Sequence, residues 1–220
     1  MSIIVRNLEG QALQHLLLDD VVYCHLSTRS PEFTKDHAVH TTLELVETEM
    51  RQSRGVSNTA NYAPLLTGFA LLDQIGGCYA DAAKPLHPNG GSAIEHALYY
   101  FLGYNPQGPE VKAIYALRNG MVHEGSLTCK TKSGSHYIFR YDSSLTSAIQ
   151  LAATPWDGEA ATLGSNTTTL VNPRVLTDNI TDAIDALRDC FFQRRADLKI
   201  LKTREEILHG YLIWQLRKLY

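Results

Sequence analysis

The chain has 220 residues, of which 44% are hydrophobic and 20% are charged, and its formal net charge at pH 7 is −3. This balance is typical of one globular domain with an apolar core. The negative net charge excludes a nucleic-acid-binding protein that is strongly basic overall. A local basic patch is still allowed, because net charge says nothing about where the charges lie.

Four widely spaced cysteines form no Cys-x-x-Cys pair, so we expect buried free thiols in a reducing compartment rather than a zinc site. They are Cys24, Cys78, Cys129 and Cys190. The chain shows no signal-peptide pattern, and no apolar run approaches the ~18 residues of a membrane span. We therefore expect a cytoplasmic protein with no membrane partner.

Apolar spacing in the first half of the chain predicts several helices. Residues 7–25 form a short helix, or a helix followed by a strand, and residues 27–36 form a loop. Helices are then expected over residues 38–51 and 62–79. Ser92 and Glu95 make a capping box for a helix over residues 93–102, which Gly103 ends.

In the second half of the chain, Pro109 or Glu110 begins a helix that glycines interrupt after residue 119. Alternation between residues 127 and 142, with a turn at 132–135, predicts a β-hairpin. Residues 152–172 are rich in polar and turn-forming residues and are expected to be mobile. A long amphipathic helix follows from about residue 173, and with a break it continues through residues 198–219.

These elements predict a mainly α fold, an antiparallel helical bundle with a small β-hairpin inserted after the helix that starts near residue 109. Residues 1–36 would be an N-terminal extension packed on the domain. Residues 37–220 would be the helical domain, with the insertion at about 127–172.

One segment carries a chemically suggestive pattern, Ala113-Ile-Tyr-Ala-Leu-Arg118-Asn119-Gly-Met-Val-His123-Glu-Gly125. Histidine can give or take a proton near neutral pH, and the guanidinium of arginine matches the oxygens of a phosphate. The pattern resembles the Arg-x(4-6)-His motif of the HEPN superfamily, including the frequent Asn directly after the Arg. The helix order over residues 38–192 is also similar to the HEPN helical bundle, although the best local match spans only residues 111–125.

The resemblance implies a metal-independent endoribonuclease that leaves 2',3'-cyclic phosphate ends and needs no cofactor. It would place Arg118, Asn119 and His123 in the catalytic site, with Asp73 as a supporting residue on an earlier helix. It also implies a homodimer with RNA as substrate, a role as a toxin or defence factor, and an antitoxin or another protein as a possible partner. The insertion after His123 is expected to cover the site.

Other interpretations of the same residues stay open at this stage. Arg118 and His123 lie about 140° apart on an ideal helix, so a kink at Gly120 or a two-chain site would bring them to one phosphate more easily. The domain could bind RNA, a nucleotide or a protein without cleaving. Asn119-Gly120 could also be a simple helix stop in a helical interaction protein, with Arg118 paired to Glu124 or Asp73. His37 and His40 lack further ligands at metal-site spacing, so we interpret them as surface residues.

Overall fold

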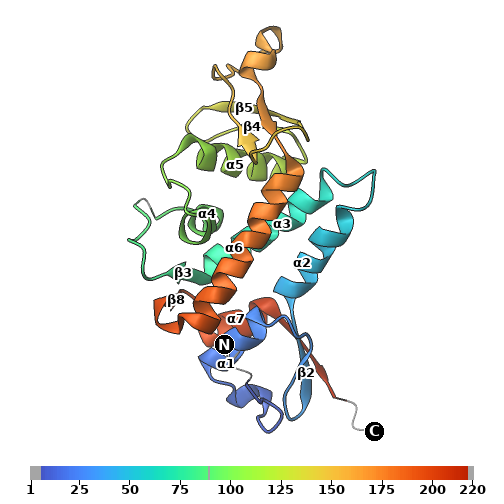
Figure 1. The fold of residues 1–220 in the computed structure, drawn as a ribbon, viewed down its shortest axis with the longest axis vertical. Helices are drawn as coiled ribbons and strands as arrows, with labels where there is room; N and C mark the ends of the chain where they lie inside the picture. The colour runs from blue at the N-terminus through green and yellow to red at the C-terminus, as the bar shows by residue number, and fades with distance from the viewer. Residues whose placement is uncertain (1–5, 89, 218–220) are drawn as a thin grey trace.

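The computed structural model describes residues 6–88 and 90–217, which form an elongated molecule with helices at its centre and β-strands at both ends (Figure 1). The structure is 49% helical and 16% strand, with three separate sheets. The prediction of a mainly α helical bundle is therefore wrong, and the fold is mixed α/β. Residues 1–5 of the expected N-terminal extension and 218–219 of the expected last helix lie outside the described residues.

Four helices form the centre of the molecule, and their packing makes most of the core. They are α2 (Thr42–Ser53), α3 (Ala63–Cys78), α4 (Ala93–Leu102) and α6 (Pro173–Gln193). The predicted capping box of α4 is present, because the Glu95 carboxylate accepts from the Ser92 amide at 2.6 Å. A Cβ added at Gly76 would lie 1.8 Å from the carbonyl oxygen of Ala93, so α3 and α4 pack more closely than any side chain there would allow.

The end of the molecule that holds both described termini contains α1 (Leu18–Leu26), α7 (Arg204–Tyr211) and a sheet of order β1-β2-β9 (Figure 1). The strands are β1 (Glu32–Phe33), β2 (His37–Thr41) and β9 (Leu212–Leu216). A two-stranded sheet joins β3 (Tyr79–Asp81) to β8 (Leu198–Ile200) nearby. On α1, the side chains of Val21, Val22 and Leu26 are fully buried.

Two sequence predictions at this end are wrong for the same physical reason. The helix expected from residue 38 begins at Thr42, and the expected helix over 198–219 is instead β8, α7 and β9. The antiparallel register runs from His37 opposite Leu216 to Thr41 opposite Leu212. Because these partners come from opposite ends of the chain, local periodicity carries no signal for their pairing.

The other end contains α5 (Pro109–Asn119), a π-helical turn η2 (Gly120–Glu124) and a four-stranded mixed sheet of order β4-β5-β7-β6. The strands are β4 (Thr128–Lys130), β5 (His136–Tyr141), β6 (Ile149–Gln150) and β7 (Thr169–Val171). The predicted hairpin is present as β4 and β5, and it lies over α5 (Figure 1). It is not an isolated hairpin, because β5 also pairs in parallel with β7, inside the segment expected to be mobile.

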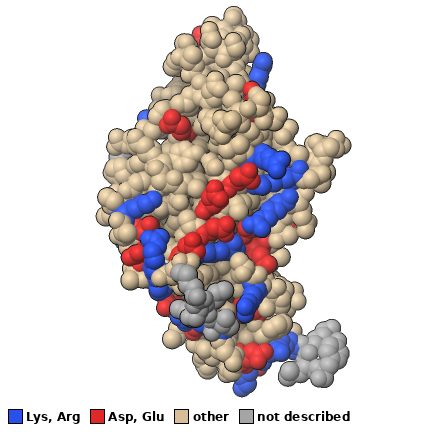
Figure 2. All heavy atoms as spheres, in the orientation of Figure 1, with Lys and Arg blue, Asp and Glu red and all other residues tan. Residues whose placement is uncertain are grey.

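Charged side chains on the face drawn in Figure 2 alternate in sign along the central helices. One ion pair between these helices joins Arg54 to Asp178 at 2.7 Å, and a second, buried pair joins Arg188 to Glu47 at 2.9 Å. The four cysteines are free and buried, as predicted. None of the helices within the described residues is long and apolar enough to cross a membrane.

Candidate active site

The π-helical turn brings Arg118 and His123 together on one face. Arg118 lies in the last turn of α5, and η2 follows directly. A π-helix closes hydrogen bonds between residues five apart, so it aligns positions i and i+5 that an α-helix separates. The Nη1 atom of Arg118 lies 2.7 Å from the Nε2 atom of His123. A local distortion at Gly120 is thus sufficient for this contact, and no second chain is needed to make it.

Close packing of the following chain against Gly120 accompanies the π-helical turn. A Cβ at Gly120 would lie 2.7 Å from the carbonyl oxygen of Thr128 and 2.9 Å from that of Ser126. The Ser126 amide donates to the Gly120 carbonyl at 2.9 Å, and Gly125 ends the turn with a φ of 61°. Both glycines are therefore required by the backbone, since one has no room for a side chain and the other is left-handed.

Asp73 on α3 and Asn119 fix the guanidinium of Arg118. Asp73 Oδ2 accepts from Arg118 Nε at 3.0 Å and from Nη2 at 2.6 Å. Asn119 Oδ1 accepts from Nη1 at 3.0 Å. The four residues singled out in the sequence, from two helices and the turn, thus form one hydrogen-bonded cluster.

The contact between Arg118 and His123 has only one possible direction. A guanidinium only donates hydrogen bonds, so Nε2 of His123 accepts this one. His123 is exposed, whereas the side chain of Arg118 is only 19% exposed. An accessible imidazole nitrogen that accepts a hydrogen bond is the group that a general base requires.

A cavity of about 630 Å³ opens over this cluster, with α5 and η2 on one side and the β4–β5 hairpin on the other. The hairpin therefore forms one wall of the cavity, and that it covers the site stays a prediction. The charged residues that line the cavity are Lys112, Arg118, Lys130, Lys132, Glu95 and Glu124. Four cations face two carboxylates, so the cavity is locally cationic in a chain whose net charge is −3.

Sequence reasoning missed several of the residues that line this cavity. Lys112 and Tyr115 precede Asn119 by seven and four positions, so they share its face of α5, and helical spacing from the motif would have found them. Lys130, Lys132 and Tyr137 reach the cavity only because the hairpin folds back over α5. Local spacing holds no signal for that return.

Cys129 also lines the cavity, which raises the question of thiol chemistry. Burial raises the pKa of the Cys129 thiol, and the negative charge of Glu124 raises it further. A thiol kept protonated in this way is a poor nucleophile, since the thiolate is the reactive species. Cys129 is therefore a weaker candidate for chemistry in this cavity than His123, which lies in contact with Arg118.

The remaining candidates from the sequence lie apart from this cluster. His37 and His40 are on β2, at the other end of the molecule from α5 (Figure 1). Within residues 6–88 and 90–217, no group of three or more His, Cys, Asp or Glu side chains is arranged to hold a metal ion.

The fold and the site together define a mixed α/β protein with an Arg-Asn-His cluster where α5 meets a π-helical turn, in the lining of a cationic cavity. Comparisons with protein families, with curated proteins and with solved structures found no match for this chain.

Proposed function

We propose that this protein is a metal-independent endoribonuclease whose catalytic residues are Arg118, Asn119 and His123. The observation that supports the proposal most is the 2.7 Å contact between Arg118 and the exposed His123 at a cationic cavity. It joins a proton acceptor to a phosphate-binding group, and these are the two functions that RNA cleavage by its own 2'-hydroxyl requires.

In the proposed reaction, the phosphate replaces His123 on Nη1 of Arg118 and frees Nε2 to accept the proton of the 2'-hydroxyl. The 2'-oxygen bonds to phosphorus and the bond to the 5'-oxygen breaks, which leaves a 2',3'-cyclic phosphate. The protonated His123 returns its proton to the departing 5'-oxygen. Arg118, held by Asp73, stabilises the charge on the phosphoryl oxygens, and Asn119 orients the phosphate or His123.

The motif supports the HEPN-type part of the proposal, and the architecture does not. The order Arg-Asn-x-x-x-His remains similar to the HEPN motif. The helical bundle that the resemblance implied is contradicted by the three sheets. The homodimer, the antitoxin or other protein partner and the role as a toxin or defence factor rest on the motif alone. The four buried free thiols support a reducing, cytoplasmic location.

A second candidate function is a binding module that holds an RNA or nucleotide phosphate without cleaving it. It is favoured by the hydrogen bonds that Arg118 already makes to Asp73, Asn119 and His123. A guanidinium has five N–H donors, and four of those of Arg118 already bond within the protein. The same bonds therefore also fit a purely structural role, in which Arg118 links α3 to α5.

Incubation of purified protein with mixed RNA in EDTA, beside His123→Ala and Arg118→Ala, separates these functions. The enzyme proposal predicts cleavage that both substitutions abolish while circular dichroism shows that the variants are folded. RNA binding that depends on Arg118 without cleavage supports the binding module. If the protein neither binds nor cleaves RNA, the role of the cluster is to link α3 to α5.

A further inference from the structure

A second cavity of about 220 Å³ adjoins the first and shares lining residues with it. Ser135 and Tyr137 line both cavities, and Pro109 at the start of α5 lines only the second. From Pro109 to Arg118 the helix extends roughly 14 Å at 1.5 Å per residue. The two cavities are therefore neighbouring compartments along one helix, with the Arg118 cluster in the first.

The lining of the second cavity is aromatic and apolar with a polar rim. Tyr137 and the half-buried Trp156 supply two aromatic surfaces, and Leu151 and Pro155 add apolar contact. No Lys, Arg, Asp or Glu is among its lining residues, in contrast to the cationic cavity beside it. This chemistry suits a flat, uncharged group.

The loop that carries Trp156 is held in place by a specific set of hydrogen bonds. Trp156 Nε1 donates to the Glu159 carbonyl at 3.0 Å, and His136 Nδ1 donates to the Asp157 carbonyl at 2.7 Å. The Asp157 carboxylate accepts from the Glu159 amide at 2.9 Å. A Cβ at Gly158, whose φ is 96°, would lie 2.6 Å from the His136 ring. The aromatic surface is thus preorganised before any ligand binds.

The size of the cavity limits what can enter it. Pockets for drug-sized ligands measure about 300–1,000 Å³, so 220 Å³ accommodates one ring system and not a whole nucleotide. Proteins recognise single-stranded RNA by stacking its unpaired bases on aromatic side chains while cations follow the backbone. Aromatic and cationic surfaces adjoin here through Ser135 and Tyr137.

We propose that this cavity receives one unpaired nucleobase of a single-stranded RNA whose backbone lies along the Arg118 cavity. The inference rests on the proposed function for its choice of RNA, and it adds a subsite that would set base preference near the cleaved bond. A free nucleotide offers the same base chemistry, and the experiment below separates the two sources.

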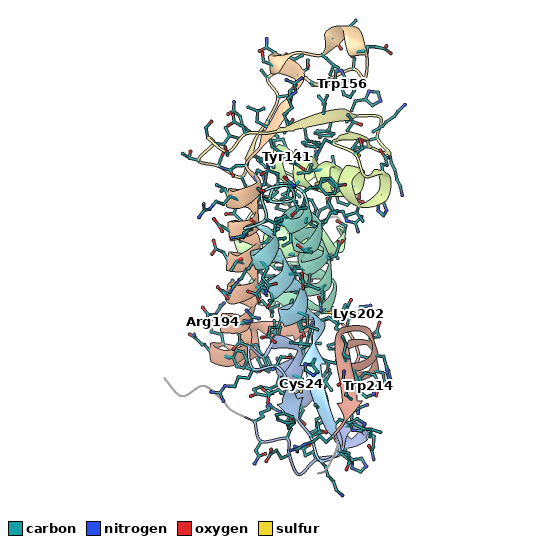
Figure 3. The ribbon with its side chains drawn as sticks, turned by 90° about the vertical axis from the view of Figure 1, so that its right-hand side faces the viewer. Cys24, Tyr141, Trp156, Arg194, Lys202 and Trp214 are labelled. Atoms are coloured by element: carbon teal, nitrogen blue, oxygen red, sulfur yellow. The ribbon has the colours of Figure 1, made fainter. Side chains whose placement is uncertain are left out.

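Fluorescence of Trp156 tests the proposal directly. The chain has two tryptophans, and Trp214 lies at the opposite end of the molecule (Figure 3), so Trp214→Phe leaves Trp156 as the only tryptophan emitter. The ligands are 2'-O-methyl hexauridylate and hexaadenylate, which cannot be cleaved through a 2'-hydroxyl, with an abasic residue placed at each position in turn. UMP and AMP are titrated in parallel to test whether a free nucleotide binds as well as the oligonucleotide. All titrations contain EDTA.

We expect the oligonucleotide to change Trp156 emission and one abasic position to weaken binding by on the order of tenfold. Trp156→Leu should weaken binding comparably and abolish the dependence on that position, whereas Trp156→Phe, which keeps an aromatic ring, should retain more affinity. UMP or AMP binding as tightly as the hexamer would overturn the RNA assignment. If hexamers with the abasic residue at different positions all bound with the same affinity, or if no hexamer bound, the base subsite would be overturned.

The outcomes also separate this inference from the proposed function. Base-dependent binding in a protein that cleaves no RNA would keep the subsite and remove the nuclease. Cleavage that is unaffected by Trp156→Leu and by abasic substitution would keep the nuclease and remove the subsite. Circular dichroism and thermal unfolding of each variant confirm that a loss of binding is not a loss of fold.

Discussion

The Nη1 atom of Arg118 donates to the Nε2 atom of His123 across 2.7 Å, although the two residues are five positions apart in the sequence. The π-helical turn at Gly120–Glu124 makes this contact possible, because one extra residue per turn moves His123 onto the face of Arg118. Short π-helical segments occur frequently at functional sites.

Gly120→Ala should disrupt the turn. The added methyl would meet the carbonyl oxygens of Thr128 and Ser126 at 2.7 and 2.9 Å, and overpacking of this kind costs about 1–3 kcal/mol of unfolding free energy. RNA cleavage or binding at the site should fall with it. Gly210→Ala on α7 is the control, since nothing lies within 4 Å of its Cβ. Equal stability of the two variants in urea would contradict the account.

Asp73→Asn should weaken the site without removing Arg118. The amide oxygen of asparagine can still accept both hydrogen bonds, but it carries no negative charge to pair with the guanidinium. We therefore expect a loss of about 1 kcal/mol in stability and on the order of tenfold in activity or phosphate affinity. Asp178→Asn, which breaks the more exposed pair with Arg54, should leave activity unchanged. If Asp73→Asn behaved like this control, Asp73 would have no supporting role.

Lys130→Ala combined with Lys132→Ala should lower RNA affinity through electrostatics. Each cation that neutralises a phosphate of a single strand contributes about 0.7 to the slope of log K against log salt. Loss of both should reduce that slope by up to about 1.4. Lys202→Ala is the control. Lys202 lies far from Trp156 (Figure 3), and its ammonium group pairs with Glu206 at 2.9 Å, so its loss should not change the slope. An unchanged slope in the double variant would place RNA outside this cavity.

His25 should make the fold less stable in mild acid. Burial, helped by the charge of Arg188, lowers the pKa of His25 from 6.5 to about 3. Between those values the unfolded chain binds a proton that the folded chain does not, so the stabilisation is complete above pH 6.5 and is lost as the pH falls towards 3. The loss between pH 7.5 and pH 5 should be about 2 kcal/mol.

Urea unfolding of the wild type and of His25→Gln at both pH values measures this contribution. The glutamine variant should be less stable at pH 7.5, since His25 contacts the Tyr79 hydroxyl at 2.6 Å and Gln74 Nε2 at 2.7 Å. It should lack the pH-dependent part of the loss, whereas His123→Ala should retain it. The same pH dependence in His25→Gln and wild type would show that His25 is not the group responsible.

Sequence reasoning succeeded where the signal is local. Helix α4 lies between Ser92 and Gly103, where a capping box and a left-handed glycine act within a few residues. The hairpin of β4 and β5 follows from alternation around one turn. Arg118, Asn119 and His123 were singled out because they are close together in the sequence, whereas Asp73 was suggested only by the family resemblance. Their role in catalysis stays a prediction.

The fold class was missed because its sheets join segments that are far apart. β2 pairs with β9, β3 with β8 and β5 with β7, and short strands such as these show little periodicity of their own. The π-helical turn was anticipated only as a kink at Gly120, because the cause is the approach of Ser126 and Thr128 from the next segment. The aromatic cavity around Trp156 depends on the same return of the chain.

The most direct measurement is the chemical identity of the RNA ends produced in EDTA by the wild type and by His123→Ala. The account predicts 2',3'-cyclic phosphate and 5'-hydroxyl ends with the wild type, seen by mass spectrometry, and none with His123→Ala. It also predicts no cleavage where a 2'-O-methyl group precedes the bond. Ends bearing 5'-phosphate, or the same cleavage by His123→Ala, would contradict the role given to His123 and its contact with Arg118.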